Sequence, residues 1–512
     1  MTLVGNIIKN ALQLSTRFNT GKRTSAISKQ RKQLRTLLKK AADTEFGKYY
    51  HFEDILKQRN GALTAFRAQV PIHDYNSLFQ KWWHKNLEGK EDICWPGKVK
   101  YFALSSGTSE SASKRIPITK DMLRSIKKTQ LRQIACMSNY PLNPDTFWKG
   151  ALLLGGSTKL TFKHTYYEGD LSGINAKHRP FWFERYYKPG KKISDQRNWE
   201  EKLEQIVENA HNWDIGCVVG VPAWMQLLME KIIERNGVKT IHDVWPNLDF
   251  YIYSGVAFAP YEKAFAKLFG KPVHTMECYL ASEGFFAYQT KPNQKAMNLV
   301  LNNEIFYEFV PFNEKNFDED GNILPNAYSY LIDQVKEGID YAIVISTCAG
   351  TWRYLIGDTV RFTNVEEAEI VITGRTKHFL SVTGEHLSVE NMVSGIEHVS
   401  NEMNLLINEF TVCSEELGNH FAHRWYLGVE EGLIASTDKQ TVKRLLDDRL
   451  CAINDDYATE RTSALKDVFI ELVPVQRFNE FLEKEGRVGA QIKFPRVLKK
   501  AQLERWKGFI KG

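Results

Sequence analysis

The sequence contains no long apolar segment. Its longest apolar runs, such as residues 151–154 and 341–345, have only the length of a β-strand, whereas a helix that spans a membrane needs about 20 apolar residues. Polar residues and a glycine interrupt residues 1–9 too early for the apolar core of a secretory signal. We therefore expect a protein without a membrane span or a secretory leader.

Cysteine is scarce and widely scattered. The seven cysteines lie at positions 94, 136, 217, 278, 348, 413 and 451, and no two of them form a Cys-x-x-Cys pair. Their odd number and wide spacing argue against a disulfide framework and against a zinc site. This pattern is typical of a cytoplasmic protein that is kept reduced.

Three common catalytic signatures are missing. The sequence has no glycine-rich loop that ends in Gly-Lys-Ser/Thr, no Gly-x-Ser-x-Gly segment and no His-Glu-x-x-His segment. These absences argue against a P-loop kinase or ATPase, an α/β-hydrolase and a zinc peptidase. If the chain is an enzyme, its chemistry needs no protein nucleophile of those kinds.

The charge balance is moderately basic, with a net charge of +7. Much of the excess lies in the first 50 residues, around a helical apolar row at positions 34, 37, 38 and 41. Such a helix could bind nucleic acid or a membrane surface, but we favour a helix packed on the body with a solvated basic face. No nucleic-acid module is present elsewhere. The basic residues are Lys22, Arg23, Lys29, Arg31, Lys32, Arg35, Lys39 and Lys40.

Apolar runs and helical patterns alternate through the middle of the chain. This alternation predicts an α/β fold with a largely parallel sheet, in which ligands collect beyond the carboxyl ends of the strands. The expected strands are 99–104, 151–154, 215–221, 248–253 and 273–278, and the expected helices are 120–138, 222–235 and 260–270.

The pattern changes from residue 304 onward. Short strands joined by turns predict a smaller α+β unit there, and the length of 512 residues allows two to four units. The expected strands are 304–310, 329–332, 341–346, 359–362, 369–373, 408–413, 424–430 and 467–474, and the expected helices are 388–407 and 437–454.

A loop rich in hydroxyl groups follows the strand predicted at 99–104. It contains Ser105, Ser106, Gly107, Thr108 and Ser109, and Lys114 comes shortly afterwards. Hydroxyl groups can donate to phosphate oxygens, glycine allows close backbone approach, and successive amides form a concavity that binds anions. The loop therefore predicts a polyphosphate site; the alternative is a solvated serine-rich turn.

Three later segments have residues suited to a nucleotide. Tyr279 can stack on a purine, and Glu283 follows a strand, where its carboxylate can hold Mg²⁺ against phosphate. Asp358, in a Gly-Asp turn, can accept hydrogen bonds from both ribose hydroxyls, and Arg375 can reach the ribose. Each segment also has an ordinary interpretation, as a solvated carboxylate or a plain turn.

In this order the four segments resemble those of the adenylate-forming superfamily. Residues 254–261 (SGVAFAPY), 306–311 (FYEFVP) and 349–360 (AGTWRYLIGDTV) narrow the resemblance to the Gretchen Hagen family. Its members are acyl acid amido synthetases, which in plants join hormones such as auxin or jasmonate to amino acids. The resemblance runs from about residue 44 to residue 496, and we expect a bacterial member of the family.

The resemblance implies a fold and a set of nucleotide contacts. The fold is α/β, with a large N-terminal domain of mixed sheets and helices over residues 1–376 that binds ATP and the acyl acid, and a smaller mobile α+β domain over 377–512. The implied contacts are Ser105, Ser106, Gly107, Thr108, Ser109 and Lys114 to the ATP phosphates, Gly255, Val256 and Tyr279 to adenine, Ser282 to the α-phosphate, Glu283 to Mg²⁺, and Asp358 and Arg375 to the ribose.

Two lysines have catalytic roles by the same resemblance. Lys377 stands where the small domain swivels between two half-reactions. Lys493, in the segment 491–496, is placed to reach the adenylation site. The alternative for Lys493 is a surface lysine, since Lys499 and Lys500 are close competitors.

Two positions depart from the family pattern. Plant relatives usually have glycine after the loop glutamate, whereas Ser111 follows Glu110 here. Many adenylate-forming enzymes have arginine two residues before the glycine of the Gly-Asp turn, where this chain has Leu355, with Arg353 nearby. These differences affect individual phosphate and ribose contacts.

The expected activity is that of a ligase dependent on ATP and Mg²⁺. It adenylates a small carboxylic acid and transfers the acyl group to an amino acid, forming an amide. The alternatives are an acyl-CoA ligase and a nucleotide-binding relative without catalysis. We expect no nucleic-acid partner and a monomer or weak dimer.

Overall fold

The computed structural model forms two compact units, which meet in the sequence between Thr376 and Lys377. It describes residues 2–19, 25–58, 61–105, 114–179, 183–255, 258, 261–318, 321–377, 379–385, 387–407, 409–485, 494–498 and 500–511. No helix among these residues has both the length and the apolar character needed to cross a membrane.

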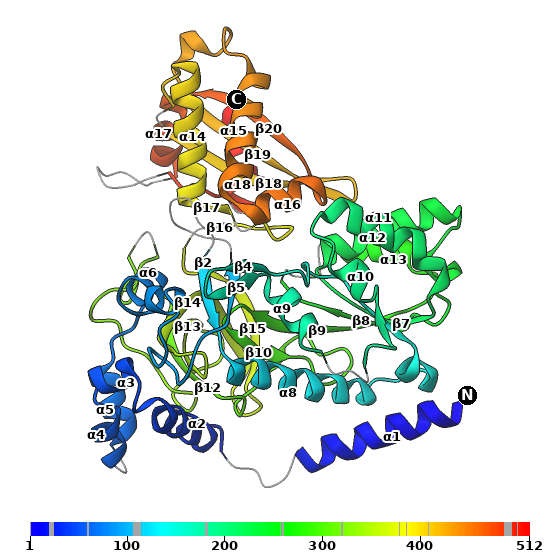
Figure 1. The fold of residues 1–512 in the computed structure, drawn as a ribbon. Coiled ribbons are helices and arrows are strands. Elements are labelled where there is room, and N and C mark those ends of the chain that lie inside the picture. Colours follow the sequence, from blue (N-terminus) through cyan, green and yellow to red (C-terminus); the bar gives the residue numbers. More distant parts are fainter. Residues whose placement is uncertain are drawn as a thin grey trace. The chain divides into compact units, whose positions relative to one another are not determined.

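In the described part of the larger unit, eleven strands form one sheet (Figure 1). Their order is β12-β13-β14-β15-β11-β10-β9-β8-β7-β3-β6. The strands are β3 (Gly150–Leu153), β6 (Tyr187–Lys188), β7 (Ile215–Val219), β8 (Phe250–Tyr253), β9 (His274–Ala281), β10 (Gly284–Tyr288), β11 (Met297–Leu299), β12 (Ile305–Pro311), β13 (Asp340–Thr347), β14 (Thr351–Asn364) and β15 (Glu369–Arg375).

The prediction of a largely parallel sheet is correct for one half of this sheet and wrong for the other. Strands β6, β3, β7, β8 and β9 pair in parallel, whereas every pair from β9 to β12 is antiparallel. The connection from β9 to β10 has only two residues. A parallel pair needs a crossover of about a dozen residues, so this short connection requires a hairpin.

The strands after residue 304 do not begin a separate small unit. β12 to β15 continue the large sheet, because antiparallel strands can join its edge through short turns. Residues 329–332, predicted as a strand, make only an isolated bridge between Tyr330 and Phe309. The strand expected at 359–362 is part of the longer strand β14.

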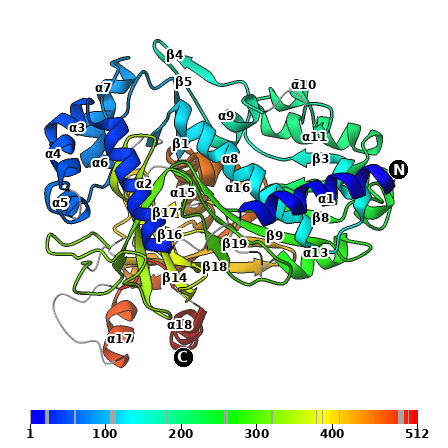
Figure 2. The same cartoon turned by 90° about the horizontal axis from the view of Figure 1, so that it is seen from below.

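Helices and a second sheet complete the larger unit. In Figure 2, α1, α2 and α8 lie across one side of the large sheet. The second sheet has the order β2-β1-β5-β4, with β1 (Tyr101–Ser105), β2 (Lys114–Ile118), β4 (Thr161–Lys163) and β5 (Tyr166–Gly169). The helices are α1 (Thr2–Asn19), α2 (Ala26–Ala41), α3 (Glu45–Tyr49), α4 (Phe52–Lys57), α5 (Ala62–Gln69), α6 (Tyr75–Leu78), α7 (His84–Leu87), α8 (Lys120–Cys136), α9 (Leu171–Lys177), α10 (Lys191–Ser194), α11 (Trp199–Asn209), α12 (Pro222–Asn236) and α13 (Glu262–Leu268).

The basic N-terminal segment is a packed helix. α2 buries its apolar row, including Leu34 and Leu37. Its Gln30 amide donates to the Ile305 carbonyl at 3.2 Å and accepts from the Tyr307 N–H at 2.7 Å. Most of its basic side chains are exposed, as expected for a helix whose apolar face is anchored on β12.

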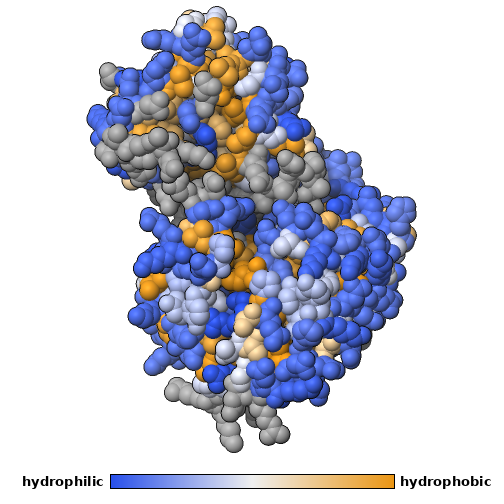
Figure 3. Space-filling view, turned by 90° about the vertical axis from the view of Figure 1, so that its left-hand side faces the viewer, coloured by the Kyte–Doolittle hydropathy of each residue, from blue (hydrophilic) through white to orange (hydrophobic). Residues whose placement is uncertain are grey.

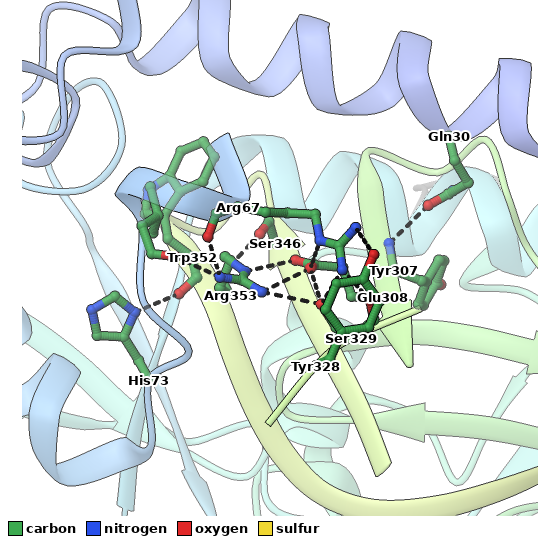
Figure 4. A network of polar contacts seen from close by, with 11 residues as sticks. Gln30, Arg67, His73, Tyr307, Glu308, Tyr328, Ser329, Ser346, Trp352 and Arg353 are labelled. Atoms are coloured by element: carbon green, nitrogen blue, oxygen red, sulfur yellow. Dashed lines mark hydrogen bonds and ion pairs between the residues drawn. The ribbon is translucent and has the colours of Figure 1, made fainter. Parts of the chain in front are cut away.

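A buried ion-pair network fixes β14 to its surroundings (Figure 4). The Arg353 guanidinium donates to both carboxylate oxygens of Glu308 at 2.9 Å, and Glu308 is 1% exposed. Arg353 also donates to the carbonyls of Val70 and Arg67, while Ser329 donates to Glu308. Many adenylate-forming enzymes have an arginine at the position of Leu355. Arg353 cannot take its place, because its guanidinium is bound to Glu308.

His73 predicts a pH dependence of stability. Its ring nitrogen Nδ1 lies 3.0 Å from the Trp352 carbonyl oxygen, and burial lowers the pKa of the ring from 6.5 to about 4. Below pH 6.5 the unfolded chain therefore binds a proton that the folded chain excludes. From pH 8 to pH 5, the free energy of unfolding should fall by about 2 kcal/mol through this residue. Urea unfolding of wild type and His73→Asn should show this loss only in wild type; equal losses would contradict the assignment.

The smaller unit has an α+β fold. Its main sheet has the order β18-β19-β20, with β18 and β19 antiparallel and β19 and β20 parallel through a helical crossover. The strands are β16 (Phe379–Leu380), β17 (Leu387–Ser388), β18 (Glu409–Leu417), β19 (His420–Val429) and β20 (Leu465–Pro474). The helices are α14 (Val389–Met403), α15 (Lys439–Ile453), α16 (Asp455–Thr462), α17 (Gln476–Lys484) and α18 (Lys500–Lys511).

Candidate active site

The β14–β15 hairpin brings Asp358 and Arg375 together. The two residues are paired in register, and Arg375 Nε lies 2.9 Å from Asp358 Oδ1. Gly357, just before Asp358, has φ +93, a conformation that favours glycine. Next to this pair, the Thr376 N–H donates to the Gly357 carbonyl at 2.8 Å. Two residues predicted to hold a ribose are therefore in contact.

Tyr279 joins this pair from β9. Its hydroxyl donates to Asp358 Oδ2, so the carboxylate is held by Arg375 on one oxygen and by Tyr279 on the other. Burial raises the pKa of Tyr279 well above its ordinary value, and the nearby Asp358 charge acts in the same direction. The phenol therefore remains a proton donor. The Tyr279 ring also packs edge-on against Phe286 at 4.8 Å between centroids.

Ser282 and Glu283 form the short connection between β9 and β10. Glu283 is 7% exposed. Burial raises the pKa of its carboxyl from 4.5 to about 7, against the opposing effect of Lys114 and with a further rise caused by Asp358. Ser282 is half-buried. The connection thus places a buried acidic group close to the Asp358 carboxylate.

Lys114 opens β2 beside the end of β1. It pairs in register with Ser105, and its ammonium lies 5.5 Å from the centroid of the Tyr75 ring. Tyr75 was not predicted as a site residue. Its hydroxyl accepts from the Arg115 N–H at 2.9 Å, and nothing in its own sequence context signals this contact. Lys114 therefore lies beside the end of β1, and its charge acts on Glu283.

Several predicted contacts lie outside the described residues. These are Ser106, Gly107, Thr108, Ser109, Val256 and Lys493. Their roles stay predictions, as do the nucleotide roles of the described residues.

Gly255 and Lys377 lie at the ends of elements. Gly255 follows the carboxyl end of β8 with φ +92, where an L side chain would be strained. β8 runs parallel to β9, so Gly255 follows the strand that neighbours the one carrying Tyr279. Lys377 is exposed and is the first residue of the smaller unit after the chain leaves β15.

The arrangement suits a polyanion that carries a cation. Lys114 and Arg375 supply positive charge, and Glu283 and Asp358 supply carboxylates. No group of three or more His, Cys, Asp or Glu side chains able to hold a metal occurs among the described residues. A cation at Glu283 would therefore take its other ligands from phosphate oxygens and water, as Mg²⁺ commonly does. Glu283 fits that role, because its carboxylate is buried and the surrounding residues do not fully balance its charge.

Two amido synthetases are examples of proteins whose sequences are similar to this chain. The chain is 23% identical to the indole-3-acetic acid-amido synthetase GH3.8 of Oryza sativa subsp. indica, over 85% of this chain and 83% of the relative. It is also 23% identical to the indole-3-acetic acid-amido synthetase GH3.4 of Arabidopsis thaliana, over 59% of this chain and 55% of the relative. The chain thus spans about half the length of the second relative and most of the first.

Solved structures share the fold. The GH3.15 acyl acid amido synthetase superposes with a TM-score of 0.58 at 15% identity, covering 98% of this chain and 96% of that one. The 2-hydroxyisobutyryl-CoA ligase in complex with 2-HIB-AMP and CoA gives a TM-score of 0.56 at 14% identity, covering 93% and 91%. The chain therefore has the same fold as these two ligases.

Family models match the chain in three consecutive parts. The GH3 family N-terminal domain matches residues 21–161 and 157–274, the central domain matches residues 298–375, and the C-terminal domain matches residues 390–502. These matches cover most of the 512 residues in the order of the family's domains. The resemblance found in the sequence is confirmed, and the chain belongs to the GH3 family.

Proposed function

We propose that this chain is an ATP-dependent ligase that converts a carboxylic acid into its adenylate and transfers the acyl group to an amino acid. The observation that carries the proposal is the contact of Tyr279, Asp358 and Arg375, with Glu283 and Lys114 nearby, in a chain of the GH3 family. The names of its relatives describe the same class of reaction.

Asp358 is the proposed ribose ligand. Arg375 and Tyr279 each engage one oxygen of its carboxylate, which fixes the orientation of the group. A carboxylate oxygen accepts more than one hydrogen bond, so ribose hydroxyls can donate to it without displacing either partner. Arg375 is oriented at the same time by its contact with Asp358, and its guanidinium is the proposed second contact to the ribose.

Glu283 is the residue that would hold Mg²⁺. A buried carboxylate is an appropriate ligand for a hard cation, and Mg²⁺, when bound, neutralises charge on the phosphates as pyrophosphate leaves. Lys114 and the loop of residues 105–109 contribute positive charge and donors to the same phosphates.

The smaller unit is proposed to serve the second half-reaction. The boundary at Lys377 is the proposed hinge, and Lys493 is the proposed contact to the adenylation site. An acyl adenylate is also attacked by water, so amide formation requires a closed site that excludes water and orients the amine.

The test of this proposal is a screen of carboxylic acids for ATP-dependent pyrophosphate release. The active acid is then incubated with the enzyme, ATP, Mg²⁺ and either the twenty amino acids or coenzyme A, and the products are read by mass spectrometry. We expect the amide. Acyl-CoA as the sole product would favour the second candidate, an acyl-CoA ligase, which the likeness to 2-hydroxyisobutyryl-CoA ligase raises. No release with any acid would favour a non-catalytic relative.

Lys377→Pro should separate the two half-reactions. Proline restricts φ to about −65°, and hinges work through a few residues at element ends that change their backbone angles. Adenylation, measured by pyrophosphate exchange, should survive, while amide formation falls at least about tenfold. Lys377→Ala is the matched control and should retain both. Equal loss of both half-reactions in a folded Lys377→Pro protein would count against the hinge.

A further inference from the structure

A depression lined by lysine and aromatic side chains opens in the larger unit, apart from the residues of the candidate active site. It is lined by Glu45, Lys48, Tyr49, Lys81, Trp82 and Lys85 and has a volume of about 450 Å³. Sites for small molecules are typically about 300–1,000 Å³. Its helix α3 lies at the left of Figure 1, on the side that Figure 3 shows, where the surface is mainly hydrophilic. We call this feature the lysine depression.

The lining carries more positive than negative charge. Lys85 is paired with Glu45, with Nζ and Oε2 2.6 Å apart. Lys48 and Lys81 form no ion pair with any described residue, and both are exposed. Two ammonium groups therefore remain uncompensated at one small concavity, which favours a ligand with at least two negative charges.

Aromatic rings hold the ammonium groups of Lys81 and Lys85 and leave one ring accessible. Lys81 Nζ lies 3.8 Å from the centroid of the Tyr49 ring and 5.3 Å from that of Trp82, and Lys85 Nζ lies 5.2 Å from Trp82. Such cation–π contacts position a flexible lysine. Tyr49 is nevertheless 55% exposed, so part of its ring can receive a planar group.

Trp82 supplies a donor without a partner. Its side chain is 4% exposed, and its indole N–H has no hydrogen-bond acceptor among the described residues. A buried donor left without an acceptor is costly. Trp82 and Lys81 belong to a π-helical turn, Phe79–Trp83, a rare conformation that is frequent at functional sites. The indole N–H is enclosed within the protein, so the π-helical turn is the observation that marks this surface as a candidate ligand site.

We propose that the lysine depression is a second nucleotide site, which takes a nucleoside phosphate. Its phosphates bind Lys48 and Lys81, and its base stacks on Tyr49. The volume is in the range of small-molecule sites, and the charge favours a polyanion. The exposed ring distinguishes a nucleotide from an inorganic polyphosphate, because every base has a face that stacks on an aromatic side chain. This site does not depend on the proposed ligase activity.

The test is equilibrium dialysis of ATP with Mg²⁺ and no acid, using the full chain. Wild type should bind ATP at the active site and at the lysine depression. Lys81→Met should weaken only the second site, by about tenfold, and Asp358→Ala should weaken only the first. Lys57→Met is the control, because Lys57 is an exposed lysine paired with Asp54 outside the depression; it should leave both sites unchanged.

Tyr49→Leu tests the class of ligand. It should weaken ATP at the second site by about tenfold and leave the binding of inorganic tripolyphosphate unchanged. A single ATP site that Asp358→Ala removes would overturn the inference while leaving the proposed ligase function intact. A second site insensitive to Lys81→Met would also overturn it. Equal binding of ATP in wild type and Tyr49→Leu would exclude a nucleotide as the occupant.

Discussion

Asp358→Ala is expected to lower the rate of acid-dependent pyrophosphate exchange by about 30- to 1,000-fold, since losing a charge-assisted contact in an active site commonly costs about 2–4 kcal/mol of transition-state stabilisation. The substitution removes the proposed ribose ligand and also the group that orients Arg375 and Tyr279. Glu283→Gln should have an effect of similar size, because it keeps the volume of the side chain and removes the charge proposed to hold Mg²⁺.

A matched control for these variants lies on a neighbouring strand. Asp340, on β13, also pairs with an arginine of β14, with Asp340 Oδ1 and Arg361 Nε 2.9 Å apart and both side chains partly exposed. Asp340→Ala should leave pyrophosphate exchange unchanged, because Asp340 is not among the proposed nucleotide ligands. Each variant is first checked for cooperative thermal unfolding. Wild-type exchange rates in folded Asp358→Ala and Glu283→Gln would remove the site assignment.

Arg353→Met is expected to destabilise the larger unit by up to about 3–5 kcal/mol, because it removes the two-point donor to the buried Glu308 carboxylate. Arg67, whose Nε lies 3.3 Å from Glu308 Oε1, and Ser329 remain as its partners. Glu308 is 1% exposed, and Arg353 donates to both of its oxygens. Methionine retains much of the length of the side chain and removes the charge and its hydrogen bonds. Denaturant unfolding followed by tryptophan fluorescence measures the effect, since Trp352 is the neighbour of Arg353 in β14.

Arg361→Met is the control for this prediction. Arg361 also makes a two-point contact with a carboxylate, Asp340, but their side chains are 44% and 33% exposed. Exposed ion pairs contribute only about 0–1 kcal/mol, so the variant should unfold nearly as wild type does. If Arg353→Met and Arg361→Met lowered the free energy of unfolding by similar amounts, burial of the ion pair would not determine the size of the loss.

The positions of many helices and strands could be predicted because their signals are local. The strand predicted at 215–221 is β7, and the helix predicted from Pro222 begins there as α12. Proline suits the first turn of a helix, and a short apolar run next to it indicates a buried strand. Thr119 likewise accepts from the Met122 N–H at the start of α8. Each of these features depends only on residues that are close to one another in the sequence.

Pairing between distant segments could not be predicted in the same way. The pattern change at residue 304 suggested a new unit, although β12 to β15 extend the existing sheet. The sequence of an apolar strand does not indicate which strand will lie next to it, or in which direction that strand will run. Whether it pairs in parallel depends on the length and path of the connection, and whether it joins an existing sheet depends on which edge is open.

The sequence by itself determined which residue types stand after the strands, and the resemblance carried by those residues identified the family. Only the tertiary structure decided which of these residues touch. Tyr279 and Asp358 are 79 positions apart and share a hydrogen bond, whereas Arg353, only five positions before Asp358, is bound to Glu308. In a strand, side chains alternate between opposite faces, and a positive φ or a bulge changes that alternation locally. Their partners are therefore set by the order and register of the strands, which no local sequence pattern contains.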